Sequence, residues 1–378
     1  MPEQRLRRVV VAFEPEAAAA RRLGRYGYAP GIAREIATYL AQASDLPAHM
    51  DEIREALSVE GIAAEFIALD DVPAHLAEVD PEDTLVWTQT DGIKFYRGSA
   101  VPALARLTGF ARYGSPVLAQ HLCQDKFASL ALAGAAGLAI LPTLLLDGEE
   151  TVGALGDVAA AAGQFFVKPA TLGAKLGIWA DSRCATFEDA KVISRRIAER
   201  YGDRALVQPF VEGDDVRVSV MDLGRPLAEQ LGIFRLVQDE GSETGGAFMT
   251  MRDNATLSGA RDTAGGRGLF GATREAAFVP RMMDLRRDPD PAARQAAATI
   301  EEGAARLARL VGLRDYFSMD FRVDAAGTPV FFEFEVCPAV TIYDFSEYLQ
   351  AVHRLKLGPA LARSMRLAFE RRWDRAEA

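Results

Sequence analysis

The segment that most constrains the fold is residues 316–341, YFSMDFRVDAAGTPVFFEFEVCPAVT. Apolar and charged residues alternate over residues 319–323, and a mostly apolar run fills residues 330–336. Both patterns are typical of β-strands. Between them, residues 325–329 contain a glycine and a proline, which favour a turn. The pattern therefore predicts a β-hairpin.

Three acids of this hairpin, Asp320, Glu333 and Glu335, are expected to project together. Side chains two apart on a strand share a face, and the turn brings the two strands side by side. Three neighbouring carboxylates repel one another unless a cation holds them. A hard cation such as Mg²⁺ takes oxygen ligands and keeps waters and phosphate oxygens in its remaining positions. The alternative is an edge hairpin with its acids in solvent, since strand acids often protect sheet edges.

The amino-terminal third alternates strands with helices. Short apolar strands are predicted at residues 8–13, 63–68 and 84–88, helices at residues 32–40 and 50–60, and a loop at residues 14–31. This order predicts an open α/β layer, in which ligands bind at the carboxyl ends of strands. Glu14, Glu16 and residues 87–91 are therefore candidates for substrate contacts. Taken singly, such residues are more often ordinary loop residues.

Two lysines are candidates for binding phosphate. Lys126 stands at the start of a predicted helix, where the helix dipole favours anions, so a bound phosphate would explain it. Lys168 is the one charge in an apolar strand at residues 164–169, and the glycine-rich residues 173–177 follow. A turn of this kind between antiparallel strands can place backbone N–H groups over phosphates, although it is not a P-loop. A simple hairpin whose lysine reaches water is the alternative.

The strand predicted at residues 205–211 contains Pro209. Because proline has no N–H for the sheet ladder, this strand is expected at a sheet edge or to end at the proline. A strand at a sheet edge has backbone groups that are not paired with another strand, so they could pair with an adenine.

One apolar run, residues 128–146, is nearly long enough to cross a membrane. Gly134, Gly137 and Pro142 interrupt it, so it is interpreted as a helix, a turn and a buried strand.

Composition excludes several classes of protein. A net charge of −10 over 378 residues disfavours a general nucleic-acid binder. Three cysteines without a CxxC pair favour neither a disulfide framework nor a zinc knuckle. The basic start leads directly into a strand and does not resemble a signal peptide. A cytoplasmic protein with no nucleic-acid or membrane partner is expected.

Four motifs follow one another in order: QDK at a helix start, VKP before a glycine loop, QPFVEGDD, and MDFRVD with GTPVFFEFEVCP. In this order they resemble the ATP-grasp superfamily, and most closely its D-alanine–D-alanine ligase-like carboxylate–amine ligases. The resemblance covers residues 124–341. It implies an α/β ATP-grasp fold of three α/β domains with ATP between the central and C-terminal domains. These are expected at residues 1–120, 121–205 and 206–378, with the metal-binding hairpin in the last.

The resemblance also implies roles for the matching residues. The residues expected at the ATP phosphates are Lys126, Lys168, Gly173, Ala174, Lys175 and Gly177. The residues expected at the adenine and ribose are Gln208, Phe210, Val211 and Asp215. The expected ligands of Mg²⁺, with Mn²⁺ as an alternative ion, are Asp320, Glu333 and Glu335. Lys168, Lys175 and Arg322 are expected to act in catalysis, Arg322 by pairing with the metal acids or the phosphates. Glu335 stands where the family usually has asparagine.

The implied reaction forms an amide or peptide bond and converts ATP to ADP through an acyl phosphate. In D-alanine–D-alanine ligases an arginine two residues before the first metal acid holds the acceptor carboxylate; here that residue is Ser318. Ala339 replaces the glycine of the acceptor site. Substrates other than D-alanine are therefore expected, but the sequence does not identify the donor, the acceptor or the pathway.

The glycine-rich residues 233–280 are either a surface insertion or a lid over an anionic substrate. They carry Arg235, Arg252, Arg261, Arg267 and Arg274. Two other functions stay open, an ATP-binding protein without turnover and a kinase that stops at phosphoryl transfer. A homodimer is an open option for the assembly.

Overall fold

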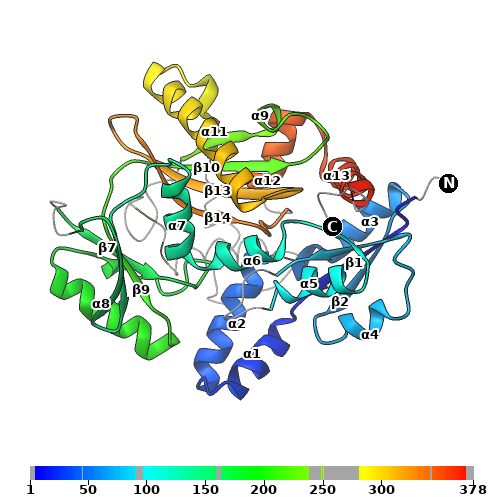
Figure 1. Ribbon diagram of the computed structural model, residues 1–378, viewed down its shortest axis with the longest axis horizontal. Helices are drawn as coiled ribbons and strands as arrows, with labels where there is room; N and C mark the ends of the chain where they lie inside the picture. Colours follow the sequence, from blue (N-terminus) through cyan, green and yellow to red (C-terminus); the bar gives the residue numbers. More distant parts are fainter. Residues whose placement is uncertain are drawn as a thin grey trace, which may run out of the picture.

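The computed structural model describes residues 5–44, 46–90, 97–158, 163–237, 248, 250, 281–340 and 343–371. Within these ranges the strands form three sheets, one of four strands and two of five. The amino-terminal sheet lies at the right of Figure 1, the second sheet at the left and the third at the upper centre.

The amino-terminal sheet is parallel and has the order β2-β1-β3-β4. Its strands are β1 (Arg8–Phe13), β2 (Ala63–Ala68), β3 (Thr84–Thr88) and β4 (Ala111–Tyr113). The helices that accompany it are α1 (Glu16–Arg25), α2 (Pro30–Ser44), α3 (Leu46–Val59), α4 (Val72–Leu76) and α5 (Ala100–Leu107). The predicted open α/β layer is confirmed.

The prediction of a loop at residues 14–31 is wrong, because α1 and the start of α2 occupy most of this segment. The segment EAAAARRLGR is rich in alanine and arginine, which favour a helix. Ala19 and Leu23 are buried on one side of α1, so the helix is stabilised by packing that local turn signals did not reveal.

The second sheet is antiparallel and has the order β6-β5-β9-β7-β8. Its strands are β5 (Thr143–Asp147), β6 (Glu150–Leu155), β7 (Phe165–Pro169), β8 (Arg183–Cys184) and β9 (Ala205–Pro209). The helices α6 (Val117–Gln124) and α7 (Lys126–Ala135) precede it, and a 3₁₀ turn (Ala180–Ser182) and α8 (Phe187–Tyr201) lie within its sequence.

Two predictions meet different outcomes in this sheet. The apolar run at residues 128–146 is a helix, a turn and a strand, as predicted. Among the described residues, no helix has the length and apolar character needed to cross a membrane. The edge position considered for residues 205–211 is wrong, because β9 lies between β5 and β7. The other option is confirmed, since β9 ends at Pro209.

The third sheet is antiparallel and has the order β12-β11-β10-β13-β14. Its strands are β10 (Asp214–Met221), β11 (Gly232–Val237), β12 (Arg281–Asp284), β13 (Tyr316–Val323) and β14 (Pro329–Glu335). Its helical elements are α9 (Leu227–Gln230), a 3₁₀ turn (Leu285–Arg287), α11 (Pro291–Val311), α12 (Tyr343–Tyr348), a π-helical turn (Leu349–His353) and α13 (Leu357–Arg371).

The predicted hairpin is confirmed as β13 and β14. In its turn, Asp324 Oδ1 accepts hydrogen bonds from the N–H groups of Ala326 and Thr328, at 2.9 and 2.8 Å. Gly327 has a left-handed φ of +79°, which glycine adopts without steric cost. Local turn chemistry therefore sets the connection between the two strands.

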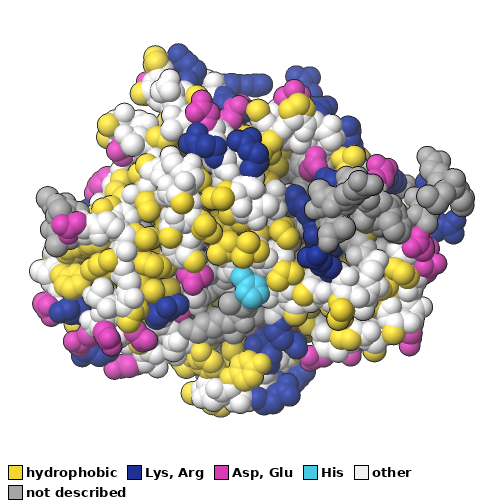
Figure 2. All heavy atoms as spheres, viewed as in Figure 1, with side chains coloured by type: hydrophobic (Ala, Val, Ile, Leu, Met, Phe, Trp, Pro, Cys, Tyr) yellow, Lys and Arg dark blue, Asp and Glu magenta, His cyan; other side chains and the backbone are white. Residues whose placement is uncertain are grey.

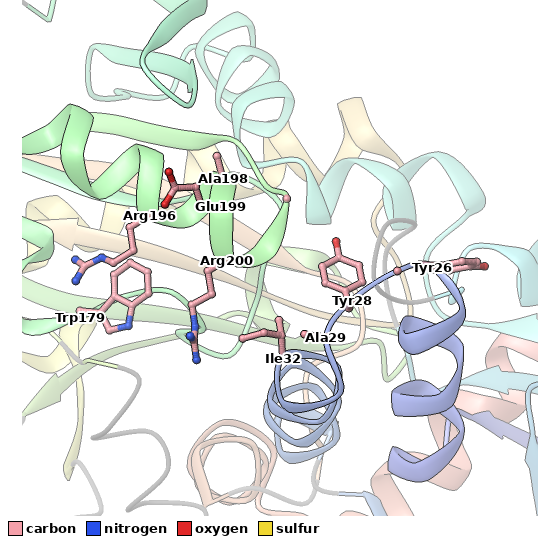
Figure 3. Close-up of a pocket in the computed structure, with 11 residues that line it drawn as sticks. Tyr26, Tyr28, Ala29, Ile32, Trp179, Arg196, Ala198, Glu199 and Arg200 are labelled. Atoms are coloured by element: carbon pink, nitrogen blue, oxygen red, sulfur yellow. The ribbon is translucent and has the colours of Figure 1, made fainter.

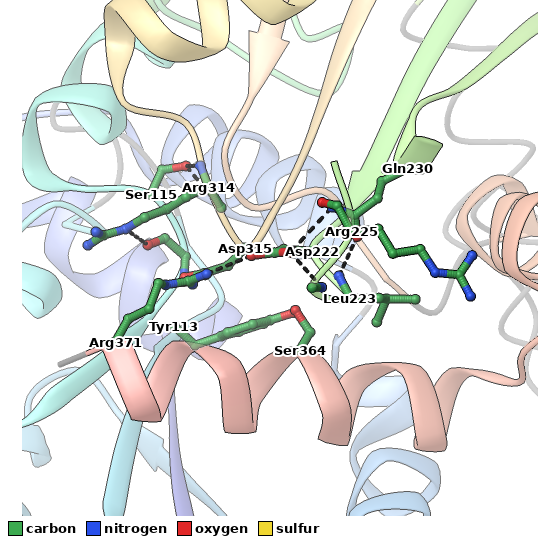
Figure 4. A network of polar contacts seen from close by, with 12 residues as sticks. Tyr113, Ser115, Asp222, Leu223, Arg225, Gln230, Arg314, Asp315, Ser364 and Arg371 are labelled. Atoms are coloured by element: carbon green, nitrogen blue, oxygen red, sulfur yellow. Dashed lines mark hydrogen bonds and ion pairs between the residues drawn. The ribbon is translucent and has the colours of Figure 1, made fainter. Parts of the chain in front are cut away.

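The carboxyl-terminal helix α13 joins the first sheet to the third. Buried residues of α13 share one apolar cluster with β1, β3 and α3. Arg371 pairs with both Asp222 and Asp315, and Asp315 Oδ2 accepts a 2.7 Å bond from Gly114 N–H (Figure 4). Asp315 immediately precedes β13, so this network fixes one end of the hairpin to the amino-terminal sheet.

The molecular surface carries both signs of charge. Basic and acidic side chains intersperse around the periphery of the face in Figure 2, and apolar side chains gather across its middle, over the region of α6 and α7. On this face, basic side chains do not form one continuous surface of the kind that would attract a nucleic acid.

Candidate functional site

One face of the hairpin presents the three predicted metal acids. Asp320 on β13 lies directly opposite Glu333 on β14, and Ser318 lies opposite Glu335. The pairing shifts after Asp320, so that the next pair is Phe321 with Phe331. This irregularity changes which side chains follow the acids along the strands. The strand β14 lies at the edge of its sheet, as the alternative interpretation of the hairpin expects. Its Glu333, however, contacts Lys126 of α7 and is not surrounded by solvent alone.

Three lysines gather around Glu333. Lys126 Nζ lies 3.4 Å from Glu333 Oε2 and donates a 2.6 Å bond to the carbonyl of Leu172. Burial alone would raise the pKa of Glu333, but the charges of Lys126, Lys168 and Lys175 outweigh it and lower that pKa. We call this group, Lys126, Lys168, Lys175 and Glu333, the lysine end of the site. Its surplus of positive charge suits an anion such as phosphate.

Lys168 is the most perturbed of these lysines. It is 7% exposed, and its Nζ lies 5.0 Å from the centre of the Phe332 ring. Burial, together with the charges of Lys126 and Lys175, lowers its pKa to about 8 against the opposing charge of Glu333. A lysine that is costly to keep charged gains most when an anion binds beside it.

The start of α7 holds Lys126 in place. Asp125 caps the helix by accepting a 3.0 Å bond from Ala128 N–H, and Lys126 N–H donates to the carbonyl of Ala170 at 3.0 Å. Lys126 is therefore fixed by its backbone as well as by its side chain.

The glycine loop, residues 173–177, lies between the antiparallel strands β7 and β8 as predicted. Ala174 and Lys175 both have left-handed φ values, 53° and 62°, as does Gly177 at 78°. Such values cost energy for residues other than glycine and persist where the surroundings enforce them. Here Leu172 and Leu176 are buried in an apolar cluster with Tyr201 and residues of α1 and α2. The loop is therefore held from behind by the amino-terminal helices.

The opposite end of the hairpin face is occupied by an arginine that the sequence analysis missed. Arg217 on β10 lies opposite Asp320, with Nε 3.0 Å from Oδ1 and Nη2 3.1 Å from Oδ2. Its Nη1 lies 3.7 Å from Glu335 Oε2, and Ser318 Oγ donates to that oxygen at 2.9 Å. We call Arg217, Asp320, Glu335 and Ser318 the arginine end. The only sequence signal for Arg217 is a single charge among valines in β10.

Glu335 has the opposite electrostatic environment to Glu333. Its side chain is 38% exposed. The protein atoms around its carboxylate replace part of the water and raise its pKa, as do the charges of Asp320 and Glu333, against the opposing charge of Arg217. An additional cation at this end would relieve the repulsion between the carboxylates.

The three acids have the right chemistry to bind a hard divalent cation, but their side chains are not arranged around one common position. All of them offer carboxylate oxygens, the ligands that Mg²⁺ and Mn²⁺ take. Within the described ranges, however, no group of three or more His, Cys, Asp or Glu side chains could hold a metal ion. In this conformation Arg217 and Lys126 are the cations beside the acids. A metal would therefore have to displace or share them.

The residues predicted at the adenine lie at the end of β9. Gln208 Nε2 donates to Thr143 Oγ1 at 2.8 Å, and Phe210 N–H donates to the carbonyl of Gln164 at 2.7 Å. The ring of Phe210 lies 4.0 Å below the guanidinium of Arg183. These contacts hold Gln208 and Phe210 at the carboxyl end of β9, inside the second sheet, where their nucleotide roles stay a prediction.

Arg322 pairs with Asp215, an acid predicted at the ribose, and pairing of Arg322 with phosphates stays a prediction. Its Nε and Nη2 donate to Asp215 Oδ1 at 3.0 and 2.7 Å, and its Nη1 donates to the carbonyl of Val211 at 3.0 Å. The expected pairing with the metal acids is therefore not what the structure shows. The reason is long-range, because the register of β10 on β13 places Asp215 opposite Arg322.

The acids predicted to contact substrate are engaged within the protein. Glu14 is bound at both oxygens by Arg22, at 2.8 and 2.7 Å, and at one by Arg97, at 3.1 Å. Glu16 accepts a hydrogen bond from Thr38. Ala339 is buried, and its role at an acceptor site stays a prediction.

The segment predicted as a lid is only partly described. Arg235 lies on β11 and pairs with Asp214 at 3.0 Å and Asp288 at 3.2 Å, so it is a strand residue and not part of a lid. The remaining arginines, Arg252, Arg261, Arg267 and Arg274, lie outside the described residues.

A pocket of about 700 Å³ lies between the α1–α2 connection and α8 (Figure 3). It is lined by the connection between α1 and α2, by Trp179 and by Arg196 and Arg200 of α8. The Arg196 guanidinium lies 3.9 Å from the centre of the Trp179 ring. None of the lysines or acids described above is among its lining residues, so this pocket is separate from the candidate site.

Comparisons with known proteins concern the sequence and the fold of the whole chain. No protein-family model matches the chain. The chain is 24% identical over 278 residues to a Streptomyces coelicolor protein named as a D-alanine–D-lactate ligase, covering 71% of this chain and 68% of that protein. It is 32% identical over 130 residues to D-alanine–D-alanine ligase A of Mesorhizobium japonicum, covering 34% of this chain and 35% of that one. The chain thus aligns with about a third of the second relative.

Solved structures match nearly the whole chain. A D-alanine–D-alanine ligase from Bacillus anthracis in complex with ATP has a TM-score of 0.60 at 14% identity, covering 96% of this chain and 99% of that one. A D-Ala:D-Ser ligase from Enterococcus faecalis has a TM-score of 0.59 at 14% identity, with the same coverage. The predicted ATP-grasp fold and the resemblance to D-alanine–D-alanine ligases are confirmed.

Proposed function

We propose that the chain is an ATP-dependent carboxylate–amine ligase that forms ADP and an amide or peptide bond, because it resembles D-alanine–D-alanine and D-alanine–D-lactate ligases in sequence and has the fold of D-alanine–D-alanine ligases. The observation that carries the proposal is the lysine end. In the part of the chain that the structure describes, the charges of three lysines act on a single carboxylate of the hairpin, Glu333, which leaves a surplus of positive charge. A nucleotide triphosphate would supply the missing negative charge.

The reaction would begin with phosphoryl transfer. A substrate carboxylate oxygen attacks the γ-phosphorus of ATP in line, the bond to the β–γ bridging oxygen breaks, and ADP leaves. Lys126 and Lys168 would hold the phosphates, and the loop with Lys175 would cover them. Because these groups are in place beforehand, they stabilise the developing charge without reorganisation.

Asp320, Glu333 and Glu335 would hold Mg²⁺, or Mn²⁺ in its place. The ion would neutralise charge on the phosphates as they separate. The fit rests on the donor chemistry of the three carboxylates and on the crowding of Asp320 and Glu333 around Glu335, whose pKa is raised first by burial and then by these two charges.

Bond formation would follow on the acyl phosphate. The amine nitrogen attacks the acyl carbon, the C–O bond to phosphate breaks, and the amine loses a proton as inorganic phosphate leaves. Free acyl phosphates hydrolyse, so holding both reactants together away from water is the main contribution of the protein to this step.

The amine substrate is proposed to differ from free D-alanine. Ser318 has no charge and donates its hydroxyl to Glu335, so it does not offer a two-point clamp for a carboxylate. Losing one partner of a buried charge pair costs about 2–5 kcal/mol, which corresponds to roughly 30-fold to several thousand-fold in affinity. The named relatives themselves join D-alanine to different acceptors, D-lactate, D-alanine or D-serine.

The test is a screen for ADP release from ATP with a pool of amino acids and hydroxy acids, followed by mass spectrometry of the products. Amine-dependent ADP formation with a condensed product is expected, and D-alanine alone should be a poor acceptor. Release of ADP that needs no amine would indicate a kinase. Binding of ATP without any release of ADP would contradict the ligase proposal.

A further inference from the structure

Asp320 and Glu335 share one guanidinium, that of Arg217. Two of its nitrogens meet the two oxygens of Asp320 at 3.0 and 3.1 Å, which is a bidentate pair. The third lies 3.7 Å from Glu335 Oε2. The Arg217 side chain is 15% exposed, so solvent screens these charges little. Strand register fixes the arrangement, because Arg217 lies opposite Asp320 on the neighbouring strand.

These two acids are also two of the three proposed metal ligands. A guanidinium and a divalent cation use the same carboxylate oxygens, so binding of one weakens binding of the other. The arrangement seen here has the guanidinium beside Asp320 and Glu335, and the described acids do not form a metal-binding group. In this arrangement Arg217 supplies positive charge to both acids.

Arg217 also brings a guanidinium to the place where Ser318 brings none. Ser318 and Asp320 are two apart on β13, and their partners on β10 are Ser219 and Arg217. The hydroxyl of Ser318 and the guanidinium of Arg217 both reach the same oxygen of Glu335. The positive charge at this end thus comes from β10 and not from β13.

We propose that Arg217 is the counter-cation of Asp320 and Glu335 whenever no divalent cation is bound to them. When a divalent cation binds these acids, the guanidinium turns to the reacting anion, first the substrate carboxylate and then the acyl phosphate. A planar guanidinium matches the paired oxygens of either group. The second half of this inference rests on the proposed function; the first half concerns only the acids, the arginine and the metal.

The first half is tested by binding of Mn²⁺ alone, without nucleotide, to the full chain. Arg217→Met removes the competing charge and keeps a long apolar side chain, so Mn²⁺ should bind more tightly, by about tenfold or 1.4 kcal/mol. The free ion can be followed by electron paramagnetic resonance. Arg235→Met is the matched control, since it removes a guanidinium from the same sheet whose partners are Asp214 and Asp288. Its Mn²⁺ affinity should equal that of the unmodified chain.

Unchanged or weaker Mn²⁺ binding by Arg217→Met would overturn the counter-cation role. Arg217→Lys guards against a folding defect, because it keeps the charge and loses only the two-point geometry. Its Mn²⁺ affinity should stay near that of the unmodified chain. These measurements need no turnover, so their failure is distinct from failure of the ligase proposal.

The second half is tested with Mg²⁺, ADP and aluminium fluoride, a mimic of the transferring phosphoryl group. Arg217→Met and Arg217→Lys should both bind this mixture at least about tenfold more weakly, since neither offers a planar fork. Arg235→Met should bind it normally. Tighter Mn²⁺ binding together with unchanged binding of the mimic would show that Arg217 neutralises the acids but does not reach the reaction centre.

Discussion

The two ends of the hairpin face have opposite imbalances of charge. At the lysine end, Lys126, Lys168 and Lys175 surround one carboxylate, and the pKa of Glu333 is lowered. At the arginine end, Asp320 and Glu335 share the guanidinium of Arg217, and the pKa of Glu335 is raised. Glu333 and Glu335 are two residues apart on one strand, a distance of about 7 Å.

The difference shows what each end lacks. The lysine end has more positive charge than its acid can neutralise, so it favours an anion. The arginine end has more negative charge than its guanidinium can neutralise, so it favours a further cation. A nucleotide and a divalent ion would correct both imbalances together, which would offset the repulsion between like charges at each end.

The largest effect is expected from Glu333→Ala, because this acid of the lysine end has two proposed roles. It offsets the lysines and is a proposed metal ligand. The kcat for ADP release should fall by about 10³-fold, in the range found when a preorganised electrostatic group is removed. The measurement is ADP release at saturating ATP and Mg²⁺ with the best substrate pair.

Glu302→Ala is the control for this change. Glu302 lies on α11 with 77% of its side chain exposed and should be dispensable. The fold of Glu333→Ala should persist, since β14 is an edge strand and its apolar residues are unchanged. Near-normal turnover of Glu333→Ala at high Mg²⁺ would contradict its place in the site.

A smaller loss is expected from Lys168→Met, which changes the lysine end alone. The apparent KM for ATP should rise and kcat should fall, with kcat/KM reduced by about 10²-fold, because the charge meets the phosphates both before and during transfer. Lys191→Met on α8 is the matched control. Lys191 pairs with Glu188 at 2.8 Å on the outside of the same sheet's helix. Equal kinetics of the two variants would make Lys168 a structural lysine.

The features of the site that depend on neighbouring residues in the sequence could be predicted from the sequence. The hairpin, its turn and the alternation that puts Glu333 and Glu335 on one face follow from neighbouring residues. Lys168 stood out as one charge in an apolar strand, and the structure places it beside Glu333 and Phe332.

The parts that could not be predicted depend on pairing between distant segments. Arg217 is 103 residues from Asp320, and only the register of β10 on β13 shows that they meet. The same register takes Arg322 to Asp215. Strand order likewise puts β9 inside its sheet despite Pro209, because the proline is its last residue.

A moderate effect is expected from Gly177→Ala in the loop of the lysine end. Gly177 has a φ of +78°, and a Cβ there would lie 2.5 Å from Cγ of Pro169. Strain of this kind costs about 1–3 kcal/mol, so the variant should unfold at a lower temperature and bind ATP more weakly. Thermal unfolding with and without ATP measures both effects.

Gly173→Ala is the matched substitution in the same loop. Nothing lies within 4 Å of a Cβ at Gly173, and its φ is not left-handed. Its stability should stay close to that of the unmodified chain. A Gly173→Ala loss as large as that of Gly177→Ala would show that the loop needs general flexibility and not one fixed conformation.

The smallest expected effect is a pH dependence of ATP binding that arises at the lysine end. The pKa of Lys168 is lowered to about 8, first by burial and then by Lys126 and Lys175. In an unfolded chain a lysine titrates near 10.4. Between these values the folded, ligand-free protein holds fewer protons than the unfolded one. Burial of Lys168 therefore lowers the free energy of unfolding, and this penalty is complete below pH 8. The penalty shrinks as the pH rises toward 10.

Binding of ATP should follow the opposite trend. Below pH 8 Lys168 is charged and ready for phosphate, whereas above it ATP must bind together with a proton. The affinity for ATP should therefore fall by at most about tenfold per pH unit above 8, since one proton is taken up. The Lys168→Met variant should bind ATP more weakly at every pH and should not show this fall in affinity above pH 8. Calorimetric titration of both proteins with ATP from pH 7 to 9.5 gives the difference. Parallel curves for the two proteins would mean that Lys168 does not take up the proton, and that the charge at the lysine end is held by Lys126 and Lys175 instead.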